Sequence, residues 1–190
     1  MTEMDHFGIP LENELWQDFI DLKNQPETFR NHKSYFNTLV SWVKKHQSHI
    51  ESIHHTLLVS NRIETILETD IDEYLSKNPE VLLDMEVKRM FSRHPETINS
   101  LLMGIGTTLW DLVRFETEEN CPNCIYDGLS YVRVEVKDTK EIKIVSECET
   151  CGYAENLDGS RYADGCANGY PVNDDDFVKY GAFAGDKMNE

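Results

Sequence analysis

The chain has 190 residues and carries 35 acidic against 18 basic side chains, a formal net charge of -17 at pH 7. Phosphate contacts need clustered Lys and Arg, so this charge argues against a general nucleic-acid binder and against docking on an anionic membrane surface. The hydrophobic fraction of 39% includes 3 Trp, 8 Tyr and 8 Phe, which is enough for a core.

The first part of the chain has the residue spacing of amphipathic helices. Pro10, followed by Glu12 and Glu14, is typical of a helix start, since Pro fits the first turn and acids favour it. Apolar side chains then follow at helical intervals as far as Leu22. This pattern predicts a first helix that opens at Pro10.

The same spacing returns several times before residue 120. A proline or a capping acid indicates each later start, at Pro26, Asp70, Asp72, Pro79 and Pro95. The last of these helices carries apolar side chains from Ile98 to Val113, and its Gly104 and Gly106 indicate either close packing or a kink. We predict five or six helices that form a compact bundle over residues 1–118.

The hydrophobic period changes to that of a strand after Gly128. Val132, Val134 and Val136 alternate with polar residues, a weaker alternation follows over residues 141–147, and a short turn separates the two runs. This pattern predicts a β-hairpin.

The remaining chain, residues 157–190, is rich in Gly and Asp and has no sustained periodicity. We expect an irregular C-terminal segment that is either packed on the body or partly flexible. The predicted fold class is therefore α+β: an N-terminal helical bundle, a small hairpin module over residues 119–156, and this irregular segment.

Four of the five cysteines form two C-x-x-C pairs, Cys121 with Cys124 and Cys148 with Cys151. In a reducing compartment this pattern indicates a metal site before disulfides. A gap of two residues lets both sulfurs of a pair face one cation, and a hairpin returns the chain to its starting end. Four thiolates can then surround one ion as a tetrahedron.

The segment 121–152 resembles a zinc ribbon, a module in which a β-hairpin brings two C-x-x-C turns together. The resemblance implies one structural Zn²⁺ held by four cysteine ligands: Cys121, Cys124, Cys148 and Cys151. Four protein ligands leave no open coordination position, so a catalytic role is not expected. Ile125 stands directly after the second cysteine, where Gly152 stands in the other pair, so the first turn is expected to be less regular.

A group of four histidines falls within ten residues, at positions 46, 49, 54 and 55. On a helix His46 and His49 share one face. We interpret His46, His49, His54 and His55 as part of a solvated or partner-facing surface, with a second metal site as the alternative.

Two further features, the aspartates at residues 174–176 and the thiol of Cys166, are interpreted as groups that bind no metal ion. Residues 174–176 are three consecutive aspartates that lack the spacing of a calcium-binding loop, so we expect a solvated acidic turn. Cys166 lies outside the two pairs and is interpreted as a small buried or partly exposed thiol, with a replacement metal ligand as the alternative.

No assembled catalytic motif is found in the sequence: there is no Walker loop, G-x-G-x-x-G, G-x-S-x-G or H-E-x-x-H. Asp138 and Glu141 flank the hairpin tip, where some ribbons of the transcription elongation type present acids to a polymerase, but Thr139 and Lys140 separate them here. We expect a protein that is not an enzyme. A dispersed catalytic site in the helical part is the alternative.

The charge indicates a basic protein partner, because carboxylates speed association with a cationic surface. Bacterial immunity proteins against toxin nucleases are similar in size, acidity and absence of motifs, so an inhibitor or immunity-type protein is the first hypothesis. The second is a zinc-ribbon adaptor in a transcription, replication or phage-related assembly, which would contact its target through Lys137, Lys140 and Lys143 near the hairpin tip.

A cytoplasmic location is expected, because Met1 to Pro10 lack the basic start and apolar run of a signal peptide. The chain also has no run of about 18 apolar residues, which a membrane-spanning helix needs.

Overall fold

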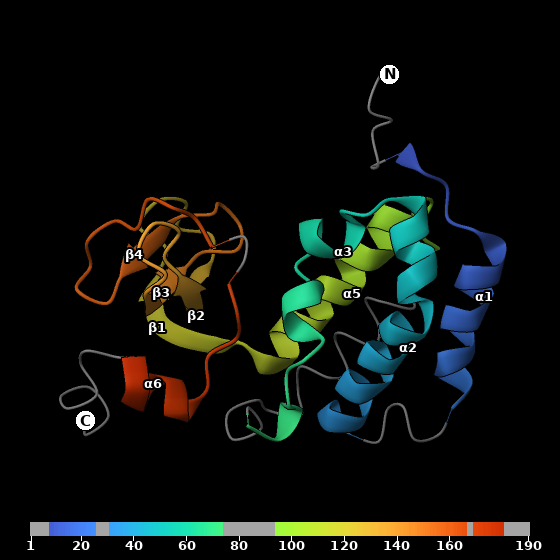
Figure 1. The fold of residues 1–190 in the computed structure, drawn as a ribbon, viewed down its shortest axis with the longest axis horizontal. Coiled ribbons are helices and arrows are strands. Elements are labelled where there is room, and N and C mark those ends of the chain that lie inside the picture. The colour runs from blue at the N-terminus through green and yellow to red at the C-terminus, as the bar shows by residue number, and fades with distance from the viewer. Residues whose placement is uncertain (1–7, 26–30, 74–93, 167–168, 181–190) are drawn as a thin grey trace. The chain divides into compact units, whose positions relative to one another are not determined.

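The computed structural model describes residues 8–25, 31–73, 94–166 and 169–180 (Figure 1). Its mixture of helices and an antiparallel sheet confirms the predicted α+β class. The chain divides into two compact units, Met1–Leu112 and Val113–Glu190. The division falls before the expected boundary at residue 118, because a strand follows directly after the last helix.

Helices form the described part of the first unit. They are α1 (Asn13–Asp21), α2 (His32–Ile53), α3 (Leu57–Ser60) and α5 (Ile98–Val113), with short 3₁₀ turns at Leu22–Asn24, Glu64–Ile66 and Ile71–Glu73. The helix expected around Pro79 lies outside the described residues. None of the described helices combines the length and the hydropathy that crossing a bilayer requires.

Two predicted helix starts are wrong. Pro10 and Thr97 form an isolated β-bridge, so α1 begins at Asn13 rather than Pro10, and α5 begins at Ile98 rather than Pro95.

The start predicted at Pro26 lies outside the described residues. Helix α2 begins at His32, where the backbone of Asn31 is extended at φ -161° and its side-chain oxygen accepts the Ser34 amide hydrogen at 2.8 Å. This is an N-cap contact, which satisfies a donor that the first helical turn leaves open.

The core of the first unit is made by the apolar faces of α1, α2 and α5. Its largest fully buried side chains include Phe19, Tyr35, Phe36, Leu39, Leu102, Ile105 and Leu109. Gly106 lets the turn after α3 approach α5, because a Cβ there would lie 2.3 Å from the carbonyl oxygen of Asn61. Of the two roles left open for this glycine, close packing is the one the structure shows.

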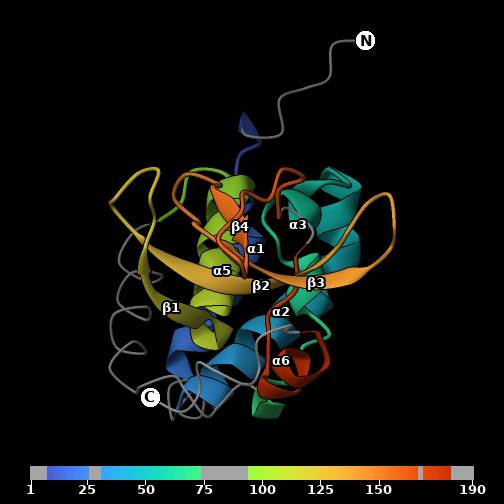
Figure 2. The same ribbon diagram turned by 90° about the vertical axis from the view of Figure 1, so that its left-hand side faces the viewer.

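The second unit contains a four-stranded antiparallel sheet in the order β1-β2-β3-β4 (Figure 2). Its strands are β1 (Phe115–Asn120), β2 (Gly128–Glu135), β3 (Ile142–Glu147) and β4 (Ala154–Asn156). β2 and β3 pair in a register that sets Val132 opposite Val145. The flanking strands β1 and β4 were not predicted, and β1 lies partly in the region assigned to the helical bundle.

The segment after β4 packs on this sheet as far as the structure describes it. Tyr170 and Arg133 exchange two backbone hydrogen bonds of 2.8 and 2.9 Å, and Val172 is buried. Helix α6 (Asp174–Tyr180) follows, so the expectation of an irregular segment is wrong for these residues. Phe177 of this helix packs against Tyr131 of β2, with ring centroids 4.9 Å apart.

Candidate metal centre

Two turns of similar backbone geometry carry the four clustered cysteines. In the first, the Cys121 amide donates to the Asp127 carbonyl at 2.9 Å, and the Ile125 amide donates to the Cys121 carbonyl at 3.0 Å. In the second, the Cys148 amide donates to the Tyr153 carbonyl and the Gly152 amide to the Cys148 carbonyl, both at 2.8 Å. Each turn thus folds its C-x-x-C pair into one tight loop.

The residue after each pair has a left-handed backbone. Gly152 has φ +67° and Ile125 has φ +56°. The first turn therefore adopts the conformation of the second, although it lacks a glycine. A β-branched residue rarely takes this conformation, because its Cβ approaches the following carbonyl oxygen.

The sheet brings the two turns together at one end. The first turn joins β1 to β2 and the second joins β3 to β4, and neighbouring strands are antiparallel. The Thr150 hydroxyl donates to a carboxylate oxygen of Asp127 at 3.0 Å, which links the turns directly. Cysteines 24 and 30 residues apart are therefore neighbours in the fold.

The four sulfur atoms form a compact cluster, all within 4.8 Å of one another. Cys121 and Cys151 have their sulfurs 3.5 Å apart, and Cys124 and Cys148 have theirs 3.6 Å apart. Four sulfurs about 2.3 Å from one ion, at tetrahedral angles, lie roughly 3.8 Å from each other. The cysteines are thus positioned to bind one metal ion, and their chemistry fits a thiolate-binding metal.

The environments of the sulfurs differ. Burial raises the pKa of the Cys148 thiol to about 12. Hydrogen bonds lower the pKa of the exposed Cys151 thiol to about 6, above all the one that the Asn123 side chain donates to its sulfur at 3.4 Å. A bound cation favours the thiolate at every position, so metal binding would release protons and weaken as the pH falls.

Asn123, Asp127 and Thr150 support the site without ligating, and sequence reasoning did not single them out. Their hydrogen bonds connect the two turns across 23 to 28 residues. A polar residue inside a C-x-x-C pair is only a weak indication of a supporting role in the sequence. The atom to which it donates a hydrogen bond is known only when the structure brings the two turns together.

The other candidates are not members of this cluster. Cys166 is buried and is not among the four grouped ligands. The Nε2 of His46 donates to the Asp18 carboxylate of α1 at 2.7 Å, and the Nε2 of His49 donates to the carboxylate of Glu12, the N-cap residue of α1, at 2.9 Å. Over the ranges the structure describes, the cysteine cluster is the metal-ligand group found.

Of the three consecutive aspartates, Asp174 and Asp175 are exposed but Asp176 is buried, so the expectation of a solvated turn is wrong for Asp176. Its carboxylate accepts from Arg133 of β2 at 2.7 Å and from the Asn173 amide at 3.2 Å. Asn173 in turn accepts the Asp176 amide hydrogen at 2.9 Å. The two residues form a reciprocal cap at the start of α6.

At the hairpin tip, Asp138 and Glu141 are both exposed. Glu141 pairs with Lys143 at 3.4 Å, and Lys140 pairs with Glu135 at 2.9 Å. Acidic and basic side chains therefore alternate at the tip, and two of its lysines form ion pairs with glutamates.

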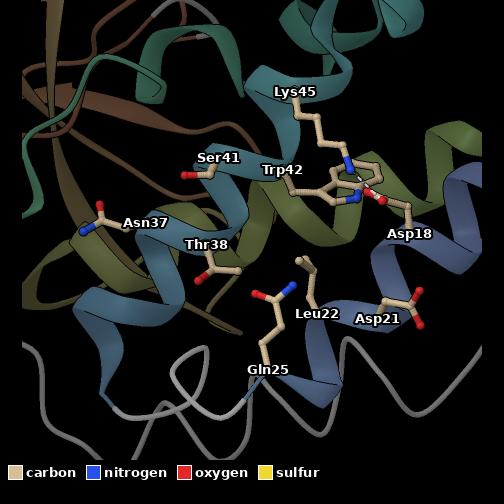
Figure 3. Close-up of a pocket in the computed structure, with 9 residues that line it drawn as sticks. All are labelled: Asp18, Asp21, Leu22, Gln25, Asn37, Thr38, Ser41, Trp42 and Lys45. Carbon is tan, nitrogen blue, oxygen red and sulfur yellow. Dashed lines mark hydrogen bonds and ion pairs between the residues drawn. The ribbon is translucent and has the colours of Figure 1, made fainter.

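A pocket of about 430 Å³ lies in the first unit between α1 and α2 (Figure 3). Gln25, Leu22, Thr38 and Trp42 point toward it. Its Asp18 carboxylate bonds Lys45 at 2.6 Å, and the His46 ring approaches the other oxygen. The charges of Asp18 and Lys45 at this pocket thus join α1 to α2, whereas Asp21 accepts a hydrogen bond from Gln17 of its own helix.

Comparison of the chain with protein families, with curated proteins and with solved structures finds no match.

Proposed function

We propose that this protein holds one structural Zn²⁺ between its four clustered cysteines and that it is a non-enzymatic, acidic protein that binds a basic protein partner. The observation that carries the first half is the closed cluster of four sulfurs from two matching turns. The net charge of -17 carries the second half.

Zinc is the metal that this ligand set favours. Four cysteine sulfurs at near-tetrahedral separations are typical of structural zinc sites, and all four coordination positions are taken by the protein. The ion would join the β1–β2 turn to the β3–β4 turn, and so tie the two edge strands to the centre of the sheet. We propose that zinc supplies much of the folding free energy of this unit, because its own apolar core around the site is small.

The zinc proposal is tested with Cys124→Ser, with Cys166→Ser as the matched control. We expect the purified control to retain one zinc per chain and Cys124→Ser to retain none, measured by elemental analysis. Loss of the ion should also reduce the sheet signal in circular dichroism and leave most of the helical signal. One zinc per chain and an unchanged fold in Cys124→Ser would contradict the proposal.

A basic partner is proposed because the metal centre lies in an acidic part of the chain. Residues 115–132 and 144–160 contain eight acids and no Lys, Arg or His. Four thiolates and Zn²⁺ would add a further charge of about -2. The lysines that would serve a nucleic-acid adaptor are partly neutralised, since Lys140 and Lys143 pair with Glu135 and Glu141.

Within this class we propose an inhibitor of the immunity type, which covers the cationic substrate groove of a nuclease with carboxylates. An adaptor in a nucleic-acid assembly is the alternative outcome of the test. The zinc-loaded chain is immobilised, exposed to a nuclease-treated lysate of its source, and washed in a salt series. Retained proteins are then purified and their nuclease activity is measured with and without the chain.

A basic protein that binds stoichiometrically and whose nuclease activity is blocked would support the inhibitor role. Retention of polymerase subunits, or of nucleic acid that is lost steeply as salt rises, would favour the adaptor instead. Retention of no basic protein would contradict a basic partner altogether.

A further inference from the structure

The first metal-binding turn ends in two exposed apolar side chains. Ile125 is 78% exposed and Tyr126 is 87% exposed, the highest values among the large hydrophobic residues that the structure describes. They directly follow Cys124, so the turn that supplies two ligands also presents them. A soluble fold gains nothing from exposing two such neighbours, and exposed apolar groups often mark interaction sites.

Ile125 is also held in an unfavourable backbone conformation. Its φ of +56° is in the left-handed region, where a residue with a Cβ costs roughly 1–2 kcal/mol. The matching position in the second turn is Gly152, which has no such cost. Because the Ile125 side chain is mostly exposed, packing inside this chain does not offset the strain. Closing the turn requires this backbone conformation but not this side chain, since Gly152 closes the matching turn without the cost, and strain of this kind is often found at functional sites.

The surroundings of this pair are acidic. Asp127 follows it, Glu119 lies exposed at the end of β1, and Glu149 stands in the facing turn, where it is paired with Arg114. The zinc-loaded cluster would add negative charge directly beneath the loop. Two apolar side chains within an acidic border are complementary to an apolar pocket rimmed by Lys or Arg, and they are a poor match for nucleic acid or for a second copy of this acidic chain.

We propose that Ile125 and Tyr126 are the contact through which this protein binds its basic protein partner. This inference rests on the proposed function and names its surface. Tyr is one of the residue types enriched among the side chains that dominate binding energies at protein interfaces, and Ile125 adds apolar area beside it. The turn is closed by the Ile125–Cys121 and Cys121–Asp127 backbone hydrogen bonds, so little conformational entropy is lost when the pair inserts into a pocket.

The probe is a phage-displayed library of random 12-residue peptides, selected against the full zinc-loaded chain. The best enriched peptide is then measured by fluorescence anisotropy against four proteins: the wild type, Ile125→Gly, Tyr126→Ser and Val178→Ser. Val178 is 73% exposed on α6 and serves as the matched control, since it is an apolar surface residue away from the turn. Zinc content is measured for every variant.

We expect enriched peptides that combine Lys or Arg with large apolar residues. Their affinity should fall about tenfold or more in Ile125→Gly and in Tyr126→Ser and stay unchanged in Val178→Ser. Ile125→Gly should retain one zinc and full thermal stability, because glycine suits φ +56°. Loss of binding in this variant therefore cannot come from loss of the fold.

Two outcomes overturn the inference and separate it from the proposed function. Basic peptides that bind both turn variants as tightly as the wild type would leave a basic partner in place and show that the surface is a different one. Enrichment of peptides without basic residues, or of none at all, would contradict the surface and the basic partner together.

Discussion

At the scale of single residues, Gly106 of α5 allows the backbone at Asn61, in the turn after α3, to approach the helix closely. Gly106 faces the carbonyl oxygen of Asn61, and the Asn61 side chain bonds Leu57 and Asn99 at 2.8 and 3.0 Å. The neighbour of this glycine is thus a backbone group in a turn that is itself held in place. A side chain at position 106 has to displace that turn.

We expect Gly106→Ala to lower the free energy of unfolding of the first unit by about 2 kcal/mol, since overpacking of a close contact costs roughly 1–3 kcal/mol. Gly8→Ala is the control, because a Cβ there meets no atom within 4 Å. Urea unfolding followed by tryptophan fluorescence measures both. Equal midpoints for the two variants would show that the turn moves without cost.

A second effect at this scale concerns pH. Hydrogen bonds from Lys45 and then from His46 hold the pKa of Asp18 below its ordinary value of 3.8. The unfolded chain therefore binds this proton more tightly, so the pairing stabilises the fold above pH about 4 and is lost as the pH falls through the folded-state pKa.

Asp18→Asn should lower the free energy of unfolding by about 0.5 kcal/mol at pH 6, a modest value because the contact is partly exposed to solvent. The difference from wild type should shrink at pH 3. Asp21→Asn removes the same charge from the same helix and is the control. A difference that stays equal at both pH values in urea titrations would rule out this role of Asp18.

At the scale of elements, the buried carboxylate of Asp176 links α6 to the sheet. Asp176 caps the helix through Asn173 and also pairs with Arg133 of β2. Arg133 holds Tyr170 through its backbone as well. The segment that leads to α6 therefore depends on residues about 40 positions earlier in the chain.

We expect Asp176→Asn to destabilise the second unit by about 2 kcal/mol, because it leaves the partly buried Arg133 without its opposite charge while the cap to Asn173 can persist. Asp175→Asn, an exposed change in the same turn, should have little effect. Hydrogen exchange of the α6 amides is the measurement. Equal protection of α6 in both variants would contradict the assignment.

The elements also show where sequence reasoning fails. β1 reads Phe-Glu-Thr-Glu-Glu-Asn and β4 has three residues, so neither has an alternating apolar face. Their conformation is decided by pairing with β2 and β3. By contrast, the alternation around Val132 and Val134 indicates β2 locally, because one face of that strand is buried.

At the scale of the whole molecule, the two units contain different spectroscopic reporters. All three tryptophans, Trp16, Trp42 and Trp110, belong to the first unit, and the four clustered cysteines belong to the second. The proposed zinc therefore acts in the unit without tryptophan. Metal removal and tryptophan fluorescence can be followed independently.

We expect a strong chelator with a thiol reductant to unfold the sheet of the second unit and to leave the tryptophan emission unchanged. Added zinc should restore the sheet, because metal binding supplies its folding free energy. Heteronuclear NMR of the holo and chelated protein measures both units at once. A tryptophan shift in step with zinc loss would show that the two units unfold together.

The sequence by itself determined the features that short-range spacing encodes. These are the helical and strand periods, and the two C-x-x-C pairs, Cys121 with Cys124 and Cys148 with Cys151. Each depends on residues two to four positions apart, which contact the same neighbour whatever the remaining chain does.

The tertiary structure decided what depends on distant partners. The β1 and β4 pairings, the burial of Asp176 against Arg133, and the approach of Asn61 to Gly106 each join residues that no local pattern connects. The left-handed conformation of Ile125 belongs here too, because it follows from closing the turn around the sulfurs. Such contacts stabilise the chain only once folding has brought the distant residues together, so a local sequence pattern does not predict them.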